Sequence, residues 1–429
     1  MPRVLQVQFL FLAALLCLPG IAWGQVSAAE PALIPYPLPR LLNGSLDFGD
    51  LDGDGDLDLL LTGLAGPESP LTRIYVLEDS VYTAAIGGYL VQLSFKVYRP
   101  VQSIVNHVWD GTARWGDFDG DGDDDVLLFG LTYVERVVGQ RTIEVVGELY
   151  RNNRGSLVQQ TSVRIPGLHA GDAAWADMDG DGDMDFAACG ATSPEPPYLP
   201  ATIVYENTGA GGLRPLDVAI PDVMLCSLAW GDMDGDGFLE LAVSGQGTDR
   251  LVTGVFRNSG DAGFEELDLD LPSLVLADLE WADFDGDGLD DLLATGGVLD
   301  PQLLRGRLLL LRSTGVGFQE VETGIQGVVS GNIAWLDYDV DGDPDIVLSG
   351  AETVLGNRIG QILVNTGGDF RREYGLAGLT QGDMAIGDYN GDGDQDILFM
   401  GVNDVGDPFV NFLMNLTFPE FLPPGLITR

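Results

Sequence analysis

One arrangement of polar and apolar positions recurs seven times along the chain. A nine-residue window of alternating acids, with glycine at position 6, is followed each time by a short run of apolar residues. The windows cover residues 50–58, 117–125, 177–185, 232–240, 283–291, 337–345 and 388–396. A large apolar residue stands two positions before each window: Phe48, Trp115, Trp175, Trp230, Trp281, Trp335 and Ile386. This regular recurrence indicates an internal structural repeat.

The apolar runs predict four short strands in each repeat. One precedes the window, and a second follows it and ends in glycine. A third ends in Asn in most copies, as in "LYRN" at 149–152, and a fourth follows a glycine-rich turn. Successive windows begin 51 to 67 residues apart, and four strands per repeat of about 50 residues is typical of propeller blades. We therefore predict an all-β fold, a seven-bladed β-propeller of four-stranded blades over residues 25–418.

The acids of each window indicate a bound cation. Four carboxylates around one point form six repelling pairs, and at ~4 Å each pair costs about 4 kcal/mol at an effective dielectric constant of ~20. Carboxylate oxygens, a glycine for the sharp turn and a backbone carbonyl at position 7 are typical of a calcium loop. The loop is not an EF-hand, because position 12 of the second copy is Leu128 and strand-like residues, not a helix, follow. We predict about seven calcium ions, one in each blade.

The stretch "WGDFDGDGDDDVLLFG" at 115–130 and its six relatives resemble the FG-GAP/VCBS repeats of integrin α-chain headpieces, a fungal seven-bladed lectin and many exported bacterial proteins. The resemblance covers roughly residues 32–418. It implies that each loop joins the first and second strands of a blade. It also implies that calcium is bound by the side chains of positions 1, 3, 5 and 9 and the carbonyl of position 7. Two departures are Val340 at position 4 and Asn390 at position 3.

The metal-binding residues implied in this way follow, window by window. They are Asp50, Asp52, Asp54, Asp56 and Asp58; Asp117, Asp119, Asp121, Asp123 and Asp125; Asp177, Asp179, Asp181, Asp183 and Asp185; Asp232, Asp234, Asp236, Phe238 and Glu240; Asp283, Asp285, Asp287, Leu289 and Asp291; Asp337, Asp339, Asp341, Asp343 and Asp345; and Asp388, Asn390, Asp392, Asp394 and Asp396.

The net charge of −45 comes mostly from these windows. They hold 34 of the 66 acidic residues, and the remaining 32 acids face 21 basic residues. Seven calcium ions, with two charges each, would return a charge of +14. Binding to nucleic acid requires basic patches, and the sequence shows none of any size, so we expect no nucleic-acid partner.

The first 24 residues predict a signal peptide. Arg3 gives a positive n-region, residues 9–18 an apolar core, and Ala22-Trp23-Gly24 a cleavage site. No other segment approaches the length of a membrane span, so we expect an exported chain, secreted or at the cell surface, with no transmembrane segment. Residues 419–429 are interpreted as a tail or linker. We expect residues 32–36 to complete blade seven and close the ring, and the C-terminal segment 418–429 is the alternative for that place.

Cys189 and Cys226 remain after processing, and the sequence favours two small buried residues over a disulfide between neighbouring blades. The tryptophans before the windows are expected to pack between blades rather than stack on sugars. His107 and His169 stand in no motif with a nucleophile, and we expect both to have structural roles.

The favoured function is a non-catalytic binding or adhesion module for an extracellular protein or matrix partner, formed by a monomeric propeller. A calcium-stabilised lectin that binds an extracellular glycan is the alternative. A propeller enzyme, such as a polysaccharide lyase or quinone dehydrogenase, is less favoured because no catalytic motif is visible. The proline-rich segment "TSPEPPYLP" at 192–200 is the candidate contact loop. We favour calcium as a permanent structural ion over calcium as a regulatory switch.

Overall fold

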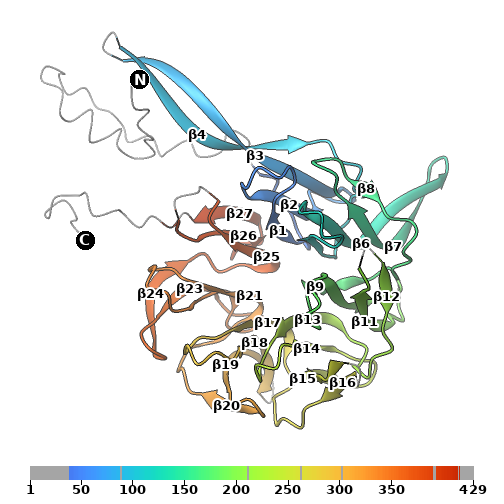
Figure 1. The fold of residues 1–429 in the computed structure, drawn as a ribbon, viewed down its shortest axis with the longest axis vertical. Helices are drawn as coiled ribbons and strands as arrows, with labels where there is room; N and C mark the ends of the chain where they lie inside the picture. The colour runs from blue at the N-terminus through green and yellow to red at the C-terminus, as the bar shows by residue number, and fades with distance from the viewer. Residues whose placement is uncertain are drawn as a thin grey trace, which may run out of the picture.

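The computed structural model describes residues 38–415, except 87–88, 210–211, 261–262, 301–302, 390–392 and 414. The predicted signal peptide, residues 32–36 and the predicted tail at 419–429 therefore lie outside the described residues. Seven antiparallel sheets form seven blades around a central opening (Figure 1). Across the described ranges, no helix has the length and apolar character needed to cross a membrane.

The first four blades each contain four strands in sequence order. Blade 1 contains β1 (Leu46–Gly49), β2 (Asp58–Leu64), β3 (Pro70–Ile86) and β4 (Tyr89–Val101). Blade 2 contains β5 (Ala113–Gly116), β6 (Asp125–Val137), β7 (Gln140–Arg151) and β8 (Val158–Gln159). Blade 3 contains β9 (His169–Ala176), β10 (Asp185–Ala191), β11 (Pro200–Asn207) and β12 (Leu213–Pro215). Blade 4 contains β13 (Met224–Gly231), β14 (Glu240–Gln246), β15 (Leu251–Asn258) and β16 (Phe264–Glu266).

The remaining blades follow the same order. Blade 5 contains β17 (Val275–Ala282), β18 (Asp291–Asp300), β19 (Leu303–Ser313) and β20 (Phe318–Val321). Blade 6 contains β21 (Val329–Leu336), β22 (Asp345–Ala351), β23 (Arg358–Asn365) and β24 (Phe370–Leu376). Blade 7 contains β25 (Thr380–Gly387), β26 (Asp396–Val402) and β27 (Pro408–Leu413), so its sheet has three strands within the described ranges. The predicted all-β propeller is confirmed, and each acidic window joins the first and second strands of its blade.

Two hairpins depart from the expected short strands. Strands β3 and β4 are 17 and 13 residues long, and their hairpin extends well beyond the disc (Figure 1). Strands β6 and β7 form a second long hairpin of 13 and 12 residues. The second-to-third and third-to-fourth connections contain no acidic window, so nothing in the repeat fixes the length of these hairpins.

Apolar side chains fill the wedge between neighbouring blades, as expected for the tryptophans. Each tryptophan packs with a cluster formed by its own blade and the one before it. Glycine opposite the ring allows close approach in several blades. A Cβ at Gly49 would lie 2.4 Å from Cγ of Trp115, and one at Gly231 would lie 2.5 Å from Cγ of Trp281. The expected packing role of the tryptophans is thus confirmed.

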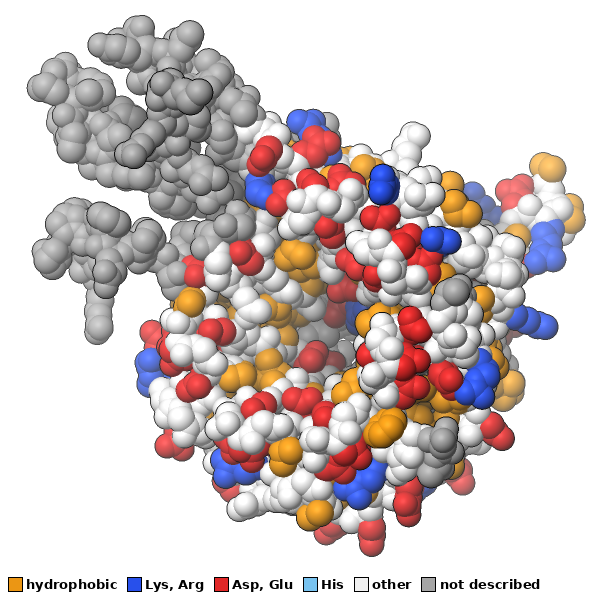
Figure 2. All heavy atoms as spheres, viewed as in Figure 1, with side chains coloured by type: hydrophobic (Ala, Val, Ile, Leu, Met, Phe, Trp, Pro, Cys, Tyr) orange, Lys and Arg blue, Asp and Glu red, His pale blue; other side chains and the backbone are white. Residues whose placement is uncertain are grey.

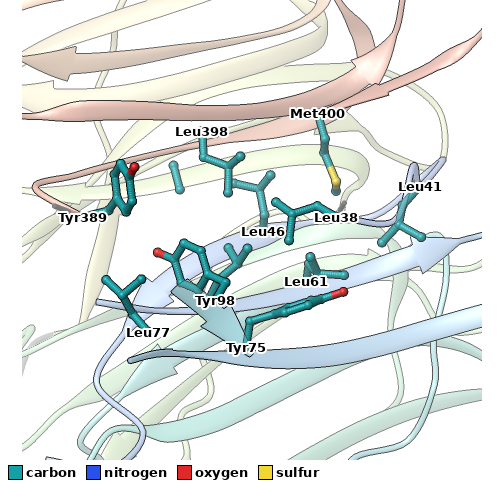
Figure 3. Close-up of a cluster of buried hydrophobic side chains, with 12 residues drawn as sticks. Leu38, Leu41, Leu46, Leu61, Tyr75, Leu77, Tyr98, Tyr389, Leu398 and Met400 are labelled. Carbon is teal, nitrogen blue, oxygen red and sulfur yellow. The ribbon is translucent and has the colours of Figure 1, made fainter. Parts of the chain in front are cut away.

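The ring closes where blade 7 meets blade 1. Leu398 and Met400 of β26 pack in one cluster with Leu38, Leu41 and Leu61 (Figure 3). Aromatic rings add to the junction, since Tyr98 of β4 stacks on Tyr389 with centroids 6.1 Å apart. Residues just before β1 therefore help to seal the ring by side-chain packing, whereas the predicted strand at 32–36 lies outside the described part of the chain.

The two mature cysteines form a disulfide, contrary to our expectation of two separate thiols. Cys189 on β10 bonds to Cys226 on β13, which connects blade 3 to blade 4. The sequence could not show this pairing because 37 residues separate the two positions, and only the packing of adjacent blades brings them together.

Candidate metal centres

The first aspartate of each window folds the loop around its own carboxylate. In the second window, Asp117 accepts hydrogen bonds from the backbone N–H groups of Asp121 and Gly122, at 3.1 and 2.9 Å. The glycine at position 6 has φ between +85° and +96° in all seven windows, a left-handed conformation that glycine adopts without strain. The sequence-based assignment of this glycine to a sharp turn is confirmed.

The acid at position 9 attaches the loop to its blade. Asp125 is fully buried. One oxygen accepts the N–H of Phe118 at 2.9 Å, and the other accepts the N–H of Asn152, directly after the third strand, at 2.6 Å. The same pair of bonds recurs at Asp185 and Asp345. Burial raises the pKa of Asp125 and Asp185 to about 7, so this site disfavours a bare negative charge.

Positions 1, 3 and 9 converge on one point. In each of five windows, one oxygen from each of these three residues lies within 4.8 Å of the other two. These groups are Asp50, Asp52 and Asp58; Asp117, Asp119 and Asp125; Asp177, Asp179 and Asp185; Asp232, Asp234 and Glu240; and Asp283, Asp285 and Asp291. Three of the five predicted ligand positions are therefore brought together in these windows.

Positions 5 and 7 have other contacts in the structure. The side chain of Asp181 at position 5 accepts the N–H of Asp183 at position 7, at 3.0 Å, and Asp287 accepts that of Leu289 in the same way. Their part in metal binding, including the carbonyl of position 7, stays a prediction. In the seventh window, Asn390 and Asp392 lie outside the described residues.

The converging oxygens fit a hard divalent cation. One carboxylate oxygen each of Asp119, Asp234 and Glu240 is buried and accepts no hydrogen bond, while the second oxygen of Asp119 pairs with Arg151. Buried polar atoms are normally satisfied, so these oxygens indicate a ligand. Burial, reinforced by the charges of neighbouring aspartates, raises the pKa of Asp179 and Asp339. A set of carboxylate oxygens without nitrogen or sulfur donors matches the preference of calcium.

The Asn that ends the third strand connects neighbouring blades. Its side-chain amide donates to the carbonyl of position 2 in the window of the preceding blade. Asn152 reaches Leu51 at 2.7 Å, and Asn365 reaches Phe284 at 2.9 Å. Asn207, Asn258 and Asn415 make the same bond, and Ser313 replaces Asn in blade 5. The recurring Asn was visible in the sequence, but its partner was not.

A second set of side chains connects the windows in pairs. Asp124 accepts the N–H of Asp50 at 2.8 Å, and Asp290 accepts that of Asp232 at 2.9 Å. Gln395 accepts the N–H of Asp337 at 2.7 Å. These three acceptors stand at position 8 of windows 2, 5 and 7, so each of these three windows supports the first residue of the preceding one.

The first strands of the blades enclose a central channel of about 540 Å³. Its wall includes four indoles and a set of carboxyl groups: Trp175, Trp230, Trp281, Trp335, Asp47, Asp172, Asp278, Glu280 and Asp383. Arg114 is the basic residue that lines it, within the described ranges, and pairs with Asp172 and Asp383 at 3.1 Å each. Burial raises the pKa of Asp278 to about 7 and that of Glu280 well above its usual range. Figure 2 shows the opening, with acidic side chains around it.

Both histidines have structural partners, as expected. Nδ1 of His107 accepts the N–H of Thr72 at 3.0 Å. His169 is buried between Asp110 and the carbonyl of Ser193, each 2.9 Å from a ring nitrogen. The edge of its ring also contacts Tyr198, so this residue of the candidate contact loop helps to hold the loop against the blade.

Comparison with protein families matches the FG-GAP-like repeat at residues 117–188 and 232–294. A comparison with curated proteins finds no match. Similar solved structures include YjhT, at 9% identity and TM-score 0.42, with 88% of this chain and 95% of that chain covered. The exotype rhamnogalacturonan lyase YesX is 14% identical at TM-score 0.34, with 88% and 90% covered. AofleA from Arthrobotrys oligospora is 10% identical at TM-score 0.41, with 80% and 88% covered.

These structural similarities are too weak to carry an argument about this chain. The repeat match covers two segments that each contain complete acidic windows, and the remaining windows follow the same spacing and the same place between first and second strands. The chain is a seven-bladed β-propeller with FG-GAP-like repeats.

Proposed function

We propose that the protein is an exported binding module whose propeller is stabilised by calcium in its acidic loops. The observation that carries the calcium proposal is the convergence of positions 1, 3 and 9, with buried oxygens of Asp234 and Glu240 that accept no hydrogen bond. The acids at these positions would hold the ion, with the predicted contributions of positions 5 and 7. Bound calcium would supply the positive charge that offsets their mutual repulsion.

This chain's own residues then transmit that effect to the fold. Position 9 connects the loop to the third strand of its blade. The Asn at the end of that strand, called here the latch Asn, connects the strand to the loop of the preceding blade. A site that scarcely exists in the unfolded chain adds its binding free energy to folding. Calcium in one loop therefore stabilises two blades, which supports a structural role for the ion.

Two features support export. The Cys189–Cys226 disulfide is the kind of bond that persists in oxidising compartments, and the sequence predicts a signal peptide. Since extracellular calcium is abundant and nearly constant, a permanent ion suits that location better than a switch does.

The experiment for the calcium proposal is thermal unfolding of the mature protein in millimolar calcium, in excess chelator and in chelator with excess magnesium. We expect the melting temperature to fall by more than ~10 °C in chelator, since loss of several sites removes several kcal/mol. Magnesium, which demands tighter octahedral geometry, should restore little of it. An unchanged melting temperature in chelator would contradict the proposal.

For the ligand, we propose a protein or matrix partner that contacts the inter-strand loops, with residues 192–200 as the first candidate. Tyr198 is 45% exposed there and Leu199 is 56% exposed, which gives a protein partner an apolar contact. Pull-down from an extracellular matrix extract should lose its specific bound protein when Tyr198 is changed to Ser. Retention of that protein by Tyr198→Ser would contradict the assignment of this loop.

Carbohydrate binding is the second candidate, and the channel favours it. Although they pack between blades, Trp230, Trp281 and Trp335 also line the channel beside carboxyl groups. Indole edges and carboxyl groups can contact sugar rings and their hydroxyl groups. Glycan-array screening in calcium tests this candidate, with Trp281→Leu expected to abolish any binding detected. We propose that neither mode is catalytic, and assays for cleavage of polysaccharides by the purified protein test that part.

A further inference from the structure

The acidic loops differ in the charge of one neighbouring residue that lies outside the nine-residue window. The residue before the latch Asn or Ser lies on the third strand, next to the loop of its own blade. It is Arg in blades 2, 4 and 5, namely Arg151, Arg257 and Arg312. It is Glu206 in blade 3, and in blade 6 it is Val364. Unlike the acids, this position therefore changes in charge from blade to blade.

Each of these arginines pairs with the position-3 carboxylate of its own loop. Nε of Arg312 lies 2.6 Å from Oδ2 of Asp285, and Nε of Arg257 lies 3.3 Å from Oδ2 of Asp234. Nε of Arg151 pairs with Asp119. All three aspartates belong to the converging groups of these loops. In blades 2, 4 and 5, a cation of the chain itself thus contacts a carboxylate that would bind calcium.

Loop 3 has the opposite charge at this place. Glu206 of β11 stands at the position that the three arginines occupy in their blades. Glu206 itself pairs with Arg214, which lies 61% exposed on the neighbouring β12. In loop 6, Val364 brings no charge. These two loops lack an arginine on position 3, while they keep the same acids at positions 1, 3 and 9.

We propose that the loops form two classes of calcium site, with loops 2, 4 and 5 weaker than loops 3 and 6. This inference rests on the proposed calcium function. In the weaker class, calcium must share the position-3 carboxylate with a guanidinium, or displace it, and the two cations repel each other. Because the arginines are partly exposed, the loss is that of a partly solvated ion pair. We expect about a tenfold difference in dissociation constant, which corresponds to ~1.4 kcal/mol.

The experiment is a calcium titration of the chelator-stripped mature protein against a calcium indicator, at fixed ionic strength. The test variant combines Arg151→Met, Arg257→Met and Arg312→Met. The matched control combines Arg136→Met, Arg307→Met and Arg371→Met. These control arginines pair with Glu144, Glu320 and Glu373, which lie outside the loops. The two variants therefore lose the same charge. The test variant loses four ion pairs, because Arg151 also pairs with Asp121, and the control loses three.

We expect the wild-type titration to resolve two classes, with the sites of loops 2, 4 and 5 about tenfold weaker than those of loops 3 and 6. In the test variant these five sites should fall into a single tight class. The control should keep both classes. Seven equivalent wild-type sites, or two classes that survive in the test variant, would overturn the inference and leave the calcium proposal intact. Absence of calcium binding in every form would overturn the calcium proposal itself.

A second variant, which adds an arginine instead of removing three, tests the same inference if the triple variant does not fold. Glu206→Arg places a guanidinium at the same position of loop 3, and Glu206→Gln is its control. The arginine variant should move one tight site into the weak class, about tenfold weaker, and the glutamine variant should change that site by less than threefold. An unchanged class distribution in Glu206→Arg would also overturn the inference.

Discussion

The acidic loops and the central channel follow opposite rules. The loops repeat the glycine at position 6 in every blade, and acids at positions 1, 3, 5 and 9 with Asn390 as the one exception. The channel wall varies: five positions before each window the chain has Ser45, Thr112, Asp172, Ser227, Asp278, Asn332 and Asp383. Several of these residues nevertheless share one structural role, which is to connect neighbouring blades. Ser45, Asp278 and Asp383 each accept a backbone N–H from the next blade, at 2.8, 2.8 and 3.0 Å.

The difference shows which residues the fold itself requires. Any short acceptor can connect neighbouring first strands, so the fold does not dictate whether that acceptor is Ser or Asp. Three positions before the window, four blades have Ala, whereas Asp47, Arg114 and Glu280 stand in the others. The charges of the channel are therefore departures from the repeat. The repeated residues therefore stabilise the ring, whereas the residues that differ between blades set the charge of the channel wall.

The largest effect is expected at the unrepeated Arg114. Its guanidinium contacts Asp172 and Asp383 and donates to the carbonyls of Ala173 and Leu46, which joins blades 7, 1 and 3 to its own blade. Arg114→Met leaves two carboxylates without their partner and should lower the free energy of unfolding by about 3 kcal/mol. Urea denaturation measures this. Arg307→Met, which removes an exposed pair with Glu320, should change it by less than ~0.5 kcal/mol.

The repeated latch should have the next largest effect. Asn152→Ala removes side-chain bonds to the carbonyls of Leu51 and Asp124 and to the N–H of Gly155. Because the buried carbonyl of Leu51 loses its donor, we expect a loss of about 2 kcal/mol. The neighbouring Asn153 is exposed, and Asn153→Ala should be nearly neutral. Equal effects of the two substitutions in urea denaturation would refute the latch.

The channel should also make stability depend on pH. Burial raises the pKa of Asp278 to about 7, with contributions from Asp172 and Asp383, and Glu280 and Arg114 also face it. The folded protein thus holds a proton that the unfolded chain releases near pH 4. Its stabilising contribution is complete below that pH and is lost as pH rises through 7. At saturating calcium, the free energy of unfolding should fall by about 2 kcal/mol from pH ~5.5 to pH ~7.5. Asp278→Asn should flatten this slope, and an equally steep slope would argue against the assignment.

The smallest effect concerns a departure within the loops. Val340 has φ of +58°, where most other windows have glycine at φ of +69° to +75°. A β-branched residue is strained in this conformation, so Val340→Gly should stabilise the protein by about 1 kcal/mol after the entropic cost of glycine. The reciprocal Gly286→Val should destabilise the protein through backbone strain, because that glycine has φ of +74°. A steric clash is not expected, because a Cβ there would meet no atom within 4 Å. A lower melting temperature for Val340→Gly would contradict this reading.

The sequence was sufficient to predict the blades and the positions of the loops, because those signals are local. Alternating acids, the glycine at position 6 and the strand after it all lie within about 15 residues. Contacts between blades were not predictable in the same way. Asn152 and Leu51 are 101 positions apart, and Arg114 reaches Asp383 across the closure of the ring.

Two signals in the sequence could have revealed more. Alignment of the repeats places Arg114 and Glu280 where most copies have Ala, which marks the channel as unusual. The same alignment shows the change from Arg to Glu or Val before the latch Asn. The lengths of the β3–β4 and β6–β7 hairpins and the Cys189–Cys226 pairing carried no such signal, because neither belongs to the repeated pattern.

The most direct test of the account is the metal content of the folded mature protein. After dialysis against millimolar calcium and removal of free ions, elemental analysis should find about seven calcium ions per chain, one for each acidic window. Folded protein that retains essentially no calcium would contradict the claim that these repeated acids exist to hold it.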